Sequence, residues 1–224
     1  MTIKTAVLGA SGRTGLAVVR ALLARNIHVI AVVRNASRLP ADLKAQVTVV
    51  EGEGTDPTTA KATLKHSPDV VVCAVGAPSP RGVQTVRTDV TRTFVDAIAN
   101  KDTVRFLAVS SVGAHDSASQ VGFITRLVLA TILKHVMADH TSQEDAITTA
   151  LPNHRWLVVR PTTLNDKPVE NDYQLMETQR LRSANISRNT VAEFIAAQVS
   201  GTDTGADKTP AHHSFWGKKI AISL

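Results

Sequence analysis

The sequence predicts one α/β domain built on a doubly wound parallel sheet, and three observations lead to this fold class. Short apolar runs rich in β-branched residues alternate with helical patterns over about the first 160 residues. A glycine-rich turn joins the first run to the first helical pattern. The chain has 224 residues and a single cysteine, Cys73, which lies inside an apolar run. It is therefore long enough to bury a core without disulfides, and Cys73 is interpreted as a packing residue.

Six apolar runs are the predicted strands. Near-continuous apolar order with many valines is typical of parallel strands that are buried on both faces. A parallel sheet in turn requires the helices between the runs as right-handed crossovers. The runs span residues 3–9, 28–34, 46–52, 69–76, 104–111 and 155–161.

Helices are predicted between these strands and after the last one. Residues 14–25, 57–66 and 85–100 show helical patterns, and residues 120–150 form either one bent helix or two. A further helix is expected to begin after Ser187 or Asn189 and to stop at Gly201. The pattern weakens after Pro161, so we expect residues 162–224 to contribute a small C-terminal cap on the substrate side, with residues 218–224 as a last edge strand.

Charge and hydropathy argue against several classes of function. The formal net charge is +6, but the basic residues are scattered and aromatic residues make up only 4% of the chain. This pattern disfavours a nucleic-acid partner and fits a small anionic ligand such as a phosphorylated cofactor. No apolar stretch reaches the ~18 residues of a membrane span, and no signal peptide is recognised, so we expect a cytoplasmic protein with no membrane partner. No histidine spacing predicts a metal site.

Gly9, Gly12 and Gly15 stand three residues apart between the first predicted strand and the first predicted helix. In this context Gly9 permits a tight turn, Gly12 lets a pyrophosphate approach the backbone, and Gly15 lets the helix pack closely on the sheet. The free N–H groups of the first helical turn would then face the phosphates. A turn without a ligand is the alternative, but a second strand at the expected distance favours a dinucleotide site.

The end of the second predicted strand indicates NADP rather than NAD. NAD-binding folds place an acidic residue roughly 20 residues beyond the glycines, where it binds the ribose 2′-OH. Here Arg34 stands nineteen residues after Gly15, and no acidic residue follows before Asp42. A guanidinium binds a 2′-phosphate through two parallel donors, whereas a carboxylate repels it. Arg13 and Arg38 are further candidates for this phosphate, and the alternative is that Arg34 is only a solvated strand end.

The G-x-x-G-x-x-G spacing resembles that of the short-chain dehydrogenase superfamily, whose catalytic unit is a serine after the fifth strand and Tyr-x-x-x-Lys on the next helix. Ser110 and Ser111 end the fifth predicted strand, where they either contact ligand or satisfy backbone groups. The tyrosine–lysine pair is absent, because His140 and Glu144 occupy those positions and the single tyrosine, Tyr173, lies downstream. His140, expected on a partly exposed helix face, is a candidate proton donor, and a purely structural role is the alternative.

Longer segments resemble the biliverdin-IXβ reductase (flavin reductase) family of atypical, NmrA-like short-chain dehydrogenases/reductases. The resemblance covers about residues 1–200 and is carried, in the family's order, by KTAVLGASGRTG, VVRNASRLP, DVVVCAVGAP, AVSSVGA and VVRPTTL. It implies a Rossmann-like fold that binds NADP(H), with Ser111 and residues 161–164 on the nicotinamide side. The cofactor contacts that follow from the residues and the resemblance together are Gly9, Ser11, Gly12, Arg13, Thr14, Gly15, Arg34, Arg38, Gly52, Glu53, Val75, Gly76, Ser110, Pro161 and Leu164.

The resemblance also implies an activity. The family reduces flavins, biliverdin and related planar acceptors with NADPH, so we expect a reductase acting on a small planar or carbonyl-containing molecule such as a flavin, tetrapyrrole or quinone, as a monomer or homodimer. Ser111 would orient the acceptor, and water or His140 would supply the proton. Phe123, Ile124 and Leu127 would form an apolar wall above the nicotinamide, unless they serve core packing or a dimer face. A non-redox isomerase or cyclase and a non-catalytic NADP-binding redox sensor remain as alternatives.

Overall fold

One eight-stranded sheet forms the centre of the computed structural model, which describes residues 2–76, 82–179, 181, 183–201 and 214–224. The strand order is β3-β2-β1-β4-β5-β6-β10-β8. All neighbouring strands are parallel except β8, which runs antiparallel to β10. The strands are β1 (Lys4–Leu8), β2 (His28–Val33), β3 (Thr48–Glu51), β4 (Val70–Cys73), β5 (Arg105–Val109), β6 (Trp156–Pro161), β8 (Gln174–Met176) and β10 (Lys219–Ser223).

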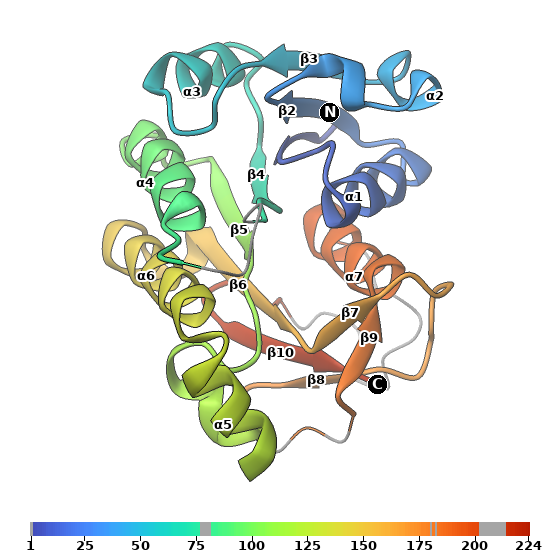
Figure 1. Cartoon of the computed structure of the whole chain (residues 1–224). Coiled ribbons are helices and arrows are strands. Elements are labelled where there is room, and N and C mark those ends of the chain that lie inside the picture. Colours follow the sequence, from blue (N-terminus) through green and yellow to red (C-terminus); the bar gives the residue numbers. More distant parts are fainter. Residues whose placement is uncertain (1, 77–81, 180, 182, 202–213) are drawn as a thin grey trace.

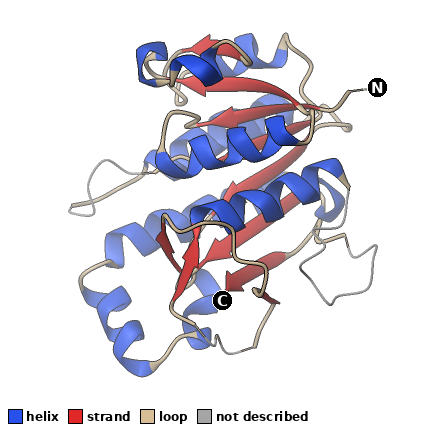
Figure 2. Ribbon diagram, turned by 90° about the vertical axis from the view of Figure 1, so that its right-hand side faces the viewer, coloured by secondary structure: helices blue, strands red, loops and turns tan. Residues whose placement is uncertain are grey.

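Helices cover both faces of this sheet, as Figures 1 and 2 show. On one face α1 packs against α7, and on the other α4 packs against α3 and α6. Each layer encloses its own apolar core, one around Phe194 and the other around Phe94 and Phe106. The helices are α1 (Arg13–Ala24), α2 (Ala41–Lys44), α3 (Pro57–Leu64), α4 (Val86–Ile98), α5 (Phe123–Thr131), α6 (Lys134–Ala150) and α7 (Arg188–Ser200), with short 3₁₀ helices η1 (Ala36–Arg38), η2 (His115–Gln120) and η3 (Asn153–Arg155).

Local chemistry explains where several helices begin and end. The Asp56 side chain accepts a hydrogen bond from the backbone N–H of Thr58, and Pro57 is the first residue of α3. Ser187, one of the two candidates from the sequence, caps α7 by accepting from the backbone N–H of Thr190 at 3.0 Å. Gly201 ends α7 in the left-handed conformation, with φ at 68°, as its sequence predicts.

The structure decides two expectations about the second half of the chain. Of the two alternatives for residues 120–150, one bent helix or two, it has two helices, α5 and α6, with Leu133 as the N-cap of the second. The strand at residues 218–224 is not an edge strand, because β8 pairs with β10 and covers its outer side. The small parallel pair β7 (Thr163–Asn165) and β9 (Asn185–Ser187) lies outside the main sheet, whereas α7 and β10 complete the main layers.

The strand order reverses between β1 and β4, and parallel α/β sheets bind ligands beyond the carboxyl ends of the strands at such a point. The register places Val7 of β1 beside Ala31 of β2 and Val72 of β4, so the three strands end together.

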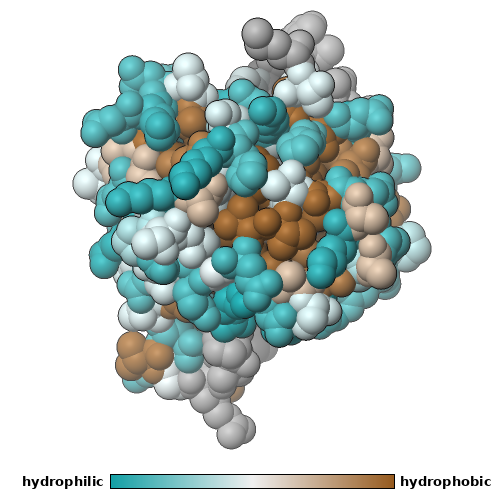
Figure 3. All heavy atoms as spheres, turned by 90° about the horizontal axis from the view of Figure 1, so that it is seen from above, coloured by the Kyte–Doolittle hydropathy of each residue, from teal (hydrophilic) through white to brown (hydrophobic). Residues whose placement is uncertain are grey.

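The face seen from above Figure 1 is largely hydrophilic around a central apolar patch (Figure 3). No helix in the described ranges is both long and apolar enough to cross a bilayer.

Candidate functional site

The glycine turn after β1 has the backbone geometry that its sequence predicts. Gly9 has φ at 75°, and its N–H approaches the carbonyl of Val32 at 3.2 Å. A Cβ on Gly9 would lie 3.1 Å from the Ala74 carbonyl oxygen, so the turn packs directly on the segment after β4. A Cβ on Gly15 would lie only 2.1 Å from the Gly9 carbonyl oxygen. Glycine is therefore required at positions 9 and 15 by conformation and by space.

The amino terminus of α1 is open to an anion. Its N-cap residue, Gly12, has no side chain to cap the helix, and the first backbone N–H to bond back into the helix is that of Leu16, at 2.8 Å from the Gly12 carbonyl. The N–H groups of Arg13, Thr14 and Gly15 precede it and have no acceptor within the helix. These donors and the positive end of the helix dipole fit the pyrophosphate of a dinucleotide.

A cavity of about 630 Å³ lies against this turn, and we call it the glycine-turn cavity. It collects residues from the carboxyl ends of β1, β2, β3 and β4, which are far apart in the sequence. Gly15 does not line it, because Gly15 packs against the turn itself. The predicted cofactor residues that do line the cavity are Gly9, Ser11, Gly12, Arg13, Thr14, Arg34, Arg38, Gly52, Glu53, Val75 and Gly76.

The arginines of the glycine-turn cavity are not equivalent. Arg34 follows β2 and Arg38 ends η1, and neither has an ion-pair partner among the described residues. Arg13, in contrast, is paired with Asp166, which also binds Arg188 at 2.7 Å. Arg34 and Arg38 are therefore available to a phosphate, whereas Arg13 would have to share or leave its carboxylate.

A second cavity, of about 690 Å³, opens at the carboxyl ends of β4, β5 and β6, and we call it the strand-end cavity. Thr14, Ala74, Val75, Gly76 and Arg188 line both cavities, so the two adjoin along the segment after β4. Of the predicted site residues, Ser110, Ser111, His140, Pro161 and Leu164 line the strand-end cavity and not the glycine-turn cavity.

The two serines after β5 have different partners. The Ser110 hydroxyl donates to Glu144 Oε1 at 2.7 Å and is buried. The Ser111 hydroxyl donates to the carbonyl of Val112 at 3.1 Å and is half-buried. Ser110 is thus committed to the protein interior, while the Ser111 oxygen keeps its acceptor capacity toward the cavity.

His140 lies on α6 but is buried, so the expectation of a partly exposed helix face is wrong. Burial, reinforced by the positive charge of Arg87, lowers the pKa of His140 to about 3. The imidazole is therefore neutral at pH 7, and an imidazolium form that could donate a proton is not populated there. Its Nδ1 is buried without a hydrogen-bond partner in the described structure.

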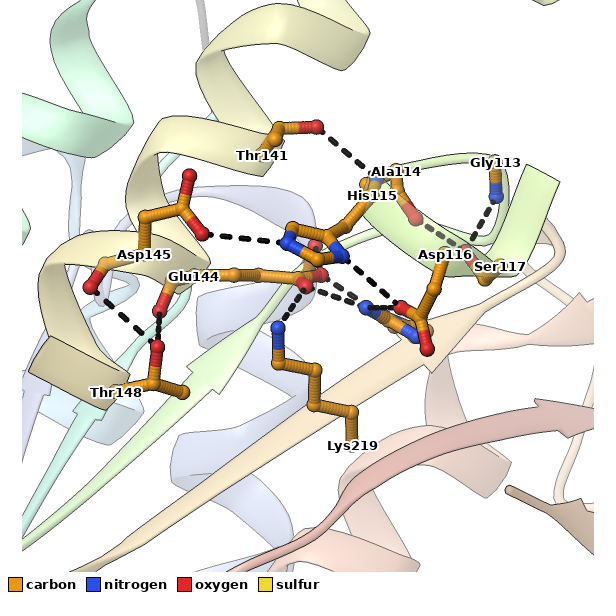
Figure 4. A network of polar contacts seen from close by, with 12 residues as sticks. Gly113, Ala114, His115, Asp116, Ser117, Thr141, Glu144, Asp145, Thr148 and Lys219 are labelled. Atoms are coloured by element: carbon orange, nitrogen blue, oxygen red, sulfur yellow. Dashed lines mark hydrogen bonds and ion pairs between the residues drawn. The ribbon is translucent and has the colours of Figure 1, made fainter. Parts of the chain in front are cut away.

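Glu144 occupies the place of the missing lysine and is the centre of a buried charge network, shown in Figure 4. Arg160 of β6 donates to both of its carboxylate oxygens, and Lys219 Nζ lies 3.3 Å from Oε2. Burial alone would raise the pKa of Glu144, but the hydrogen bonds and charge of Arg160 outweigh burial and lower it. Arg160 also binds Asp116 at 2.6 Å. Glu144 is consequently a paired anion that joins α6 to the sheet.

Other expected features lie elsewhere. Tyr173 packs edge-on against Phe194 in the core beside α7. Phe123 and Leu127 are 77% and 56% exposed and do not line the strand-end cavity, whose wall on α5 is made by Thr125 and Leu129; the side chain of Ile124 is outside the described structure. The predicted apolar wall is therefore wrong for Phe123 and Leu127, because those side chains point to the outer side of α5. No cluster of three metal-binding side chains occurs among the described residues.

Arg87, Asp139 and Arg188 are functional candidates that sequence reasoning missed. Arg87 and Arg188 line the strand-end cavity, and Asp139 binds Arg87 at 3.1 Å. Arg87 and Asp139 come from different helices and are 52 residues apart, so no local spacing links them. The only signal was that Asp139 precedes His140 on the helix facing the sheet.

Comparison with known proteins agrees with this geometry. A family model described as NAD(P)H-binding matches residues 9–202. A solved short-chain dehydrogenase/reductase from Veillonella parvula is 19% identical, with a TM-score of 0.78 over 99% of this chain and 94% of that one. An anaerobillin reductase from Escherichia coli is 20% identical, with a TM-score of 0.74 over 98% of this chain and 96% of that one. An oxidoreductase from Lactococcus lactis is 17% identical, with a TM-score of 0.75 over 98% and 90%.

At these identities the solved structures show a shared fold, and the family match covers most of the chain. The expected Rossmann-like doubly wound sheet is confirmed. The chain belongs to the NAD(P)H-binding family, and its fold is that of the short-chain dehydrogenases/reductases.

Proposed function

We propose that the protein is an NADPH-dependent reductase that delivers a hydride to a small planar or carbonyl-containing acceptor. The observation that carries this proposal is the meeting of two cavities along Val75 and Gly76. The glycine-turn cavity has donors for phosphates at one end, and the strand-end cavity is a space of similar size lined by both apolar and polar side chains. A dinucleotide on the glycine turn would bring its nicotinamide to this junction, next to an acceptor in the strand-end cavity.

NADPH, when bound, supplies the hydride, and the chain's own residues bind and orient the reactants. The amino terminus of α1 binds the pyrophosphate, and Arg34 with Arg38 binds the 2′-phosphate. Ser111, Pro161 and Leu164 line the strand-end cavity, where they would position the nicotinamide against the acceptor. Because His140 is neutral at pH 7, water is the proton source that fits this site. Proximity and orientation would account for most of the rate.

The absorbance of NADPH in the presence of a panel of flavins, quinones and tetrapyrroles tests the reaction. Oxidation of NADPH by at least one acceptor, with reduced acceptor formed in equal amount, is the expected result. Tight NADPH binding without turnover on any acceptor would instead indicate a redox sensor. Conversion of a substrate without NADPH consumption would indicate an isomerase or cyclase on the same fold.

The preference for NADPH over NADH is tested by Arg34→Asp. Arg34 has no competing ion pair, and charge-assisted hydrogen bonds contribute about 1.5–3 kcal/mol each. We therefore expect NADPH to bind ~10–100-fold more weakly, with a much smaller change for NADH. Arg92→Asp, an exposed charge reversal on α4 away from both cavities, is the matched control. An equal loss for the two dinucleotides would contradict the assignment of Arg34 to the 2′-phosphate.

A further inference from the structure

One wall of the strand-end cavity, between α4 and α6, is polar. Neither the glycine motif nor the position of the serines predicts this wall. Arg87 of α4 and His140 of α6 both line the cavity and are 9% and 6% exposed. Arg87 Nη1 donates to Asp139 Oδ2 at 3.1 Å. We call Arg87, Asp139 and His140 the α4–α6 wall. It places one buried cation next to a ligand-sized space.

The Asp139 carboxylate binds other groups in addition to Arg87. It also accepts the backbone N–H groups of Arg87 and Thr88, at 3.2 and 3.0 Å, and the Thr88 hydroxyl at 2.8 Å. These N–H groups are in the first turn of α4, so Asp139 caps that helix from α6. A helix amino terminus carries roughly half a positive charge. One carboxylate therefore faces a full cation and a helix dipole, and the balance at the α4–α6 wall is positive.

His140 contributes no charge to this wall. Burial, reinforced by the positive charge of Arg87, lowers its pKa, so the imidazole is neutral at pH 7. Its Nδ1 is buried, so a ligand in the strand-end cavity would meet the other ring nitrogen of this side chain, which can form one hydrogen bond there. The attraction for an anion therefore comes from Arg87, and the neutral ring adds no opposing charge.

We infer that the α4–α6 wall binds an anionic oxygen of an otherwise apolar substrate, with Arg87 supplying the charge and neutral His140 a hydrogen bond. The apolar part would lie against Val109, Val112 and Leu129, which line the same cavity. This inference rests on the proposed function in so far as it takes the strand-end cavity as the acceptor side.

The anionic oxygen has two sources with the same chemistry. It is a carboxylate that the substrate already carries, or it is the oxygen of a conjugated carbonyl during reduction. In the second case the hydride from NADPH forms a C–H bond on the acceptor, NADPH is oxidised, and the displaced electron pair resides on oxygen until water protonates it. Arg87 would then stabilise charge that develops in the transition state, which raises kcat without changing KM.

A binding experiment tests the carboxylate source without any turnover. Calorimetric titration compares 2-naphthoate with 2-naphthamide, which has the same shape and no charge, on wild-type protein at pH 7 with NADP⁺ present. The expected result is that naphthoate binds at least about tenfold more tightly, and that Arg87→Met removes this preference while Arg87→Lys retains part of it. Arg92→Met, on the exposed side of α4, is the matched control and should keep the preference.

A kinetic experiment tests the developing-charge source with menadione, an uncharged quinone. Arg87→Met should lower kcat for NADPH oxidation at least tenfold with KM nearly unchanged, and Arg87→Lys should restore part of it. Either the naphthoate preference or the kcat effect supports the inference and identifies the source. Absence of both overturns it. If the wild-type protein oxidises no NADPH, the proposed function fails, and the naphthoate comparison alone decides the inference.

Loss of Arg87 could unfold the protein, because Asp139 would keep a buried charge with fewer donors. Circular dichroism of each variant checks this point. The comparison of the two ligands on wild-type protein needs no variant, and His140→Phe is a second variant that leaves Arg87 in place. His140→Phe should weaken naphthoate binding severalfold and leave naphthamide binding unchanged. Equal affinities for both ligands on wild-type protein, with unchanged naphthoate binding in His140→Phe, contradict the carboxylate source.

Discussion

Replacing Gly15 by alanine is the most direct test of how α1 is joined to the sheet. A Cβ at this position would lie 2.1 Å from the Gly9 carbonyl oxygen and 2.9 Å from both the Gly9 carbonyl carbon and the Ala10 Cα. Real Cβ atoms do not approach other heavy atoms below 3.0 Å. All three neighbours are backbone atoms of the turn, so no side-chain rotation relieves the contact. The turn or the helix must move.

The size of the effect follows from two opposing terms. Forcing extra atoms into a packed interior costs about 1–3 kcal/mol, and a contact with rigid backbone belongs at the upper end, about 3 kcal/mol. Alanine is favoured over glycine inside a helix by about 1 kcal/mol, which offsets part of this cost. The net loss is about 2 kcal/mol. For a chain of this size each kcal/mol lowers the Tm by roughly 2–4 °C, so Gly15→Ala should melt ~4–8 °C below wild type.

Differential scanning calorimetry of the protein without added dinucleotide measures this difference. Gly76→Ala is the matched control, because a Cβ there meets nothing within 4 Å and the residue does not have positive φ. Its Tm should stay within about 1 °C of wild type. A Gly15→Ala protein that melts together with the control would refute the argument that close packing of helix on strand requires glycine at position 15.

Two further predictions concern the buried charges. Glu144→Gln removes the anion that Arg160 binds, and should lower the free energy of unfolding in urea by about 3–5 kcal/mol, whereas Asp42→Asn, at an exposed ion pair with Arg20, should change it by less than about 1 kcal/mol. Between pH 6.5 and about 3 the unfolded chain protonates His140 and the folded chain does not. This residue should therefore make stability fall as pH drops from 6.5 to 5, with a slope that approaches about 1.4 kcal/mol per pH unit and that His140→Gln should lack. If stability depends on pH with the same slope in wild type and His140→Gln, the pKa of His140 is not lowered.

Local patterns predicted seven of the eight strands of the main sheet, all but β8, and the glycine turn after β1. These strands are visible in the sequence as near-continuous apolar runs, because a strand buried on both faces needs an apolar residue at every position. The glycines and Arg34 were also readable, since a tight turn and the residue after the second strand have positions set by chain distance. The substrate side was not readable in this way, because its wall is made of single residues from β5, α4, α5, α6 and β6.

His140 of α6 shows which property the sequence determines and which only the tertiary structure decides. From the sequence alone His140 was recognised as the residue in place of a catalytic tyrosine, because spacing along one chain segment is enough for that. Only the packing of α6 against α4 decided that the imidazole is buried beside Arg87 and therefore neutral. Charge state depends on neighbours and on access to water, and both are set by contacts between segments that are distant in the chain. The same reason explains why Glu144 proved to be the partner of Arg160 and Ser110 rather than a free carboxylate.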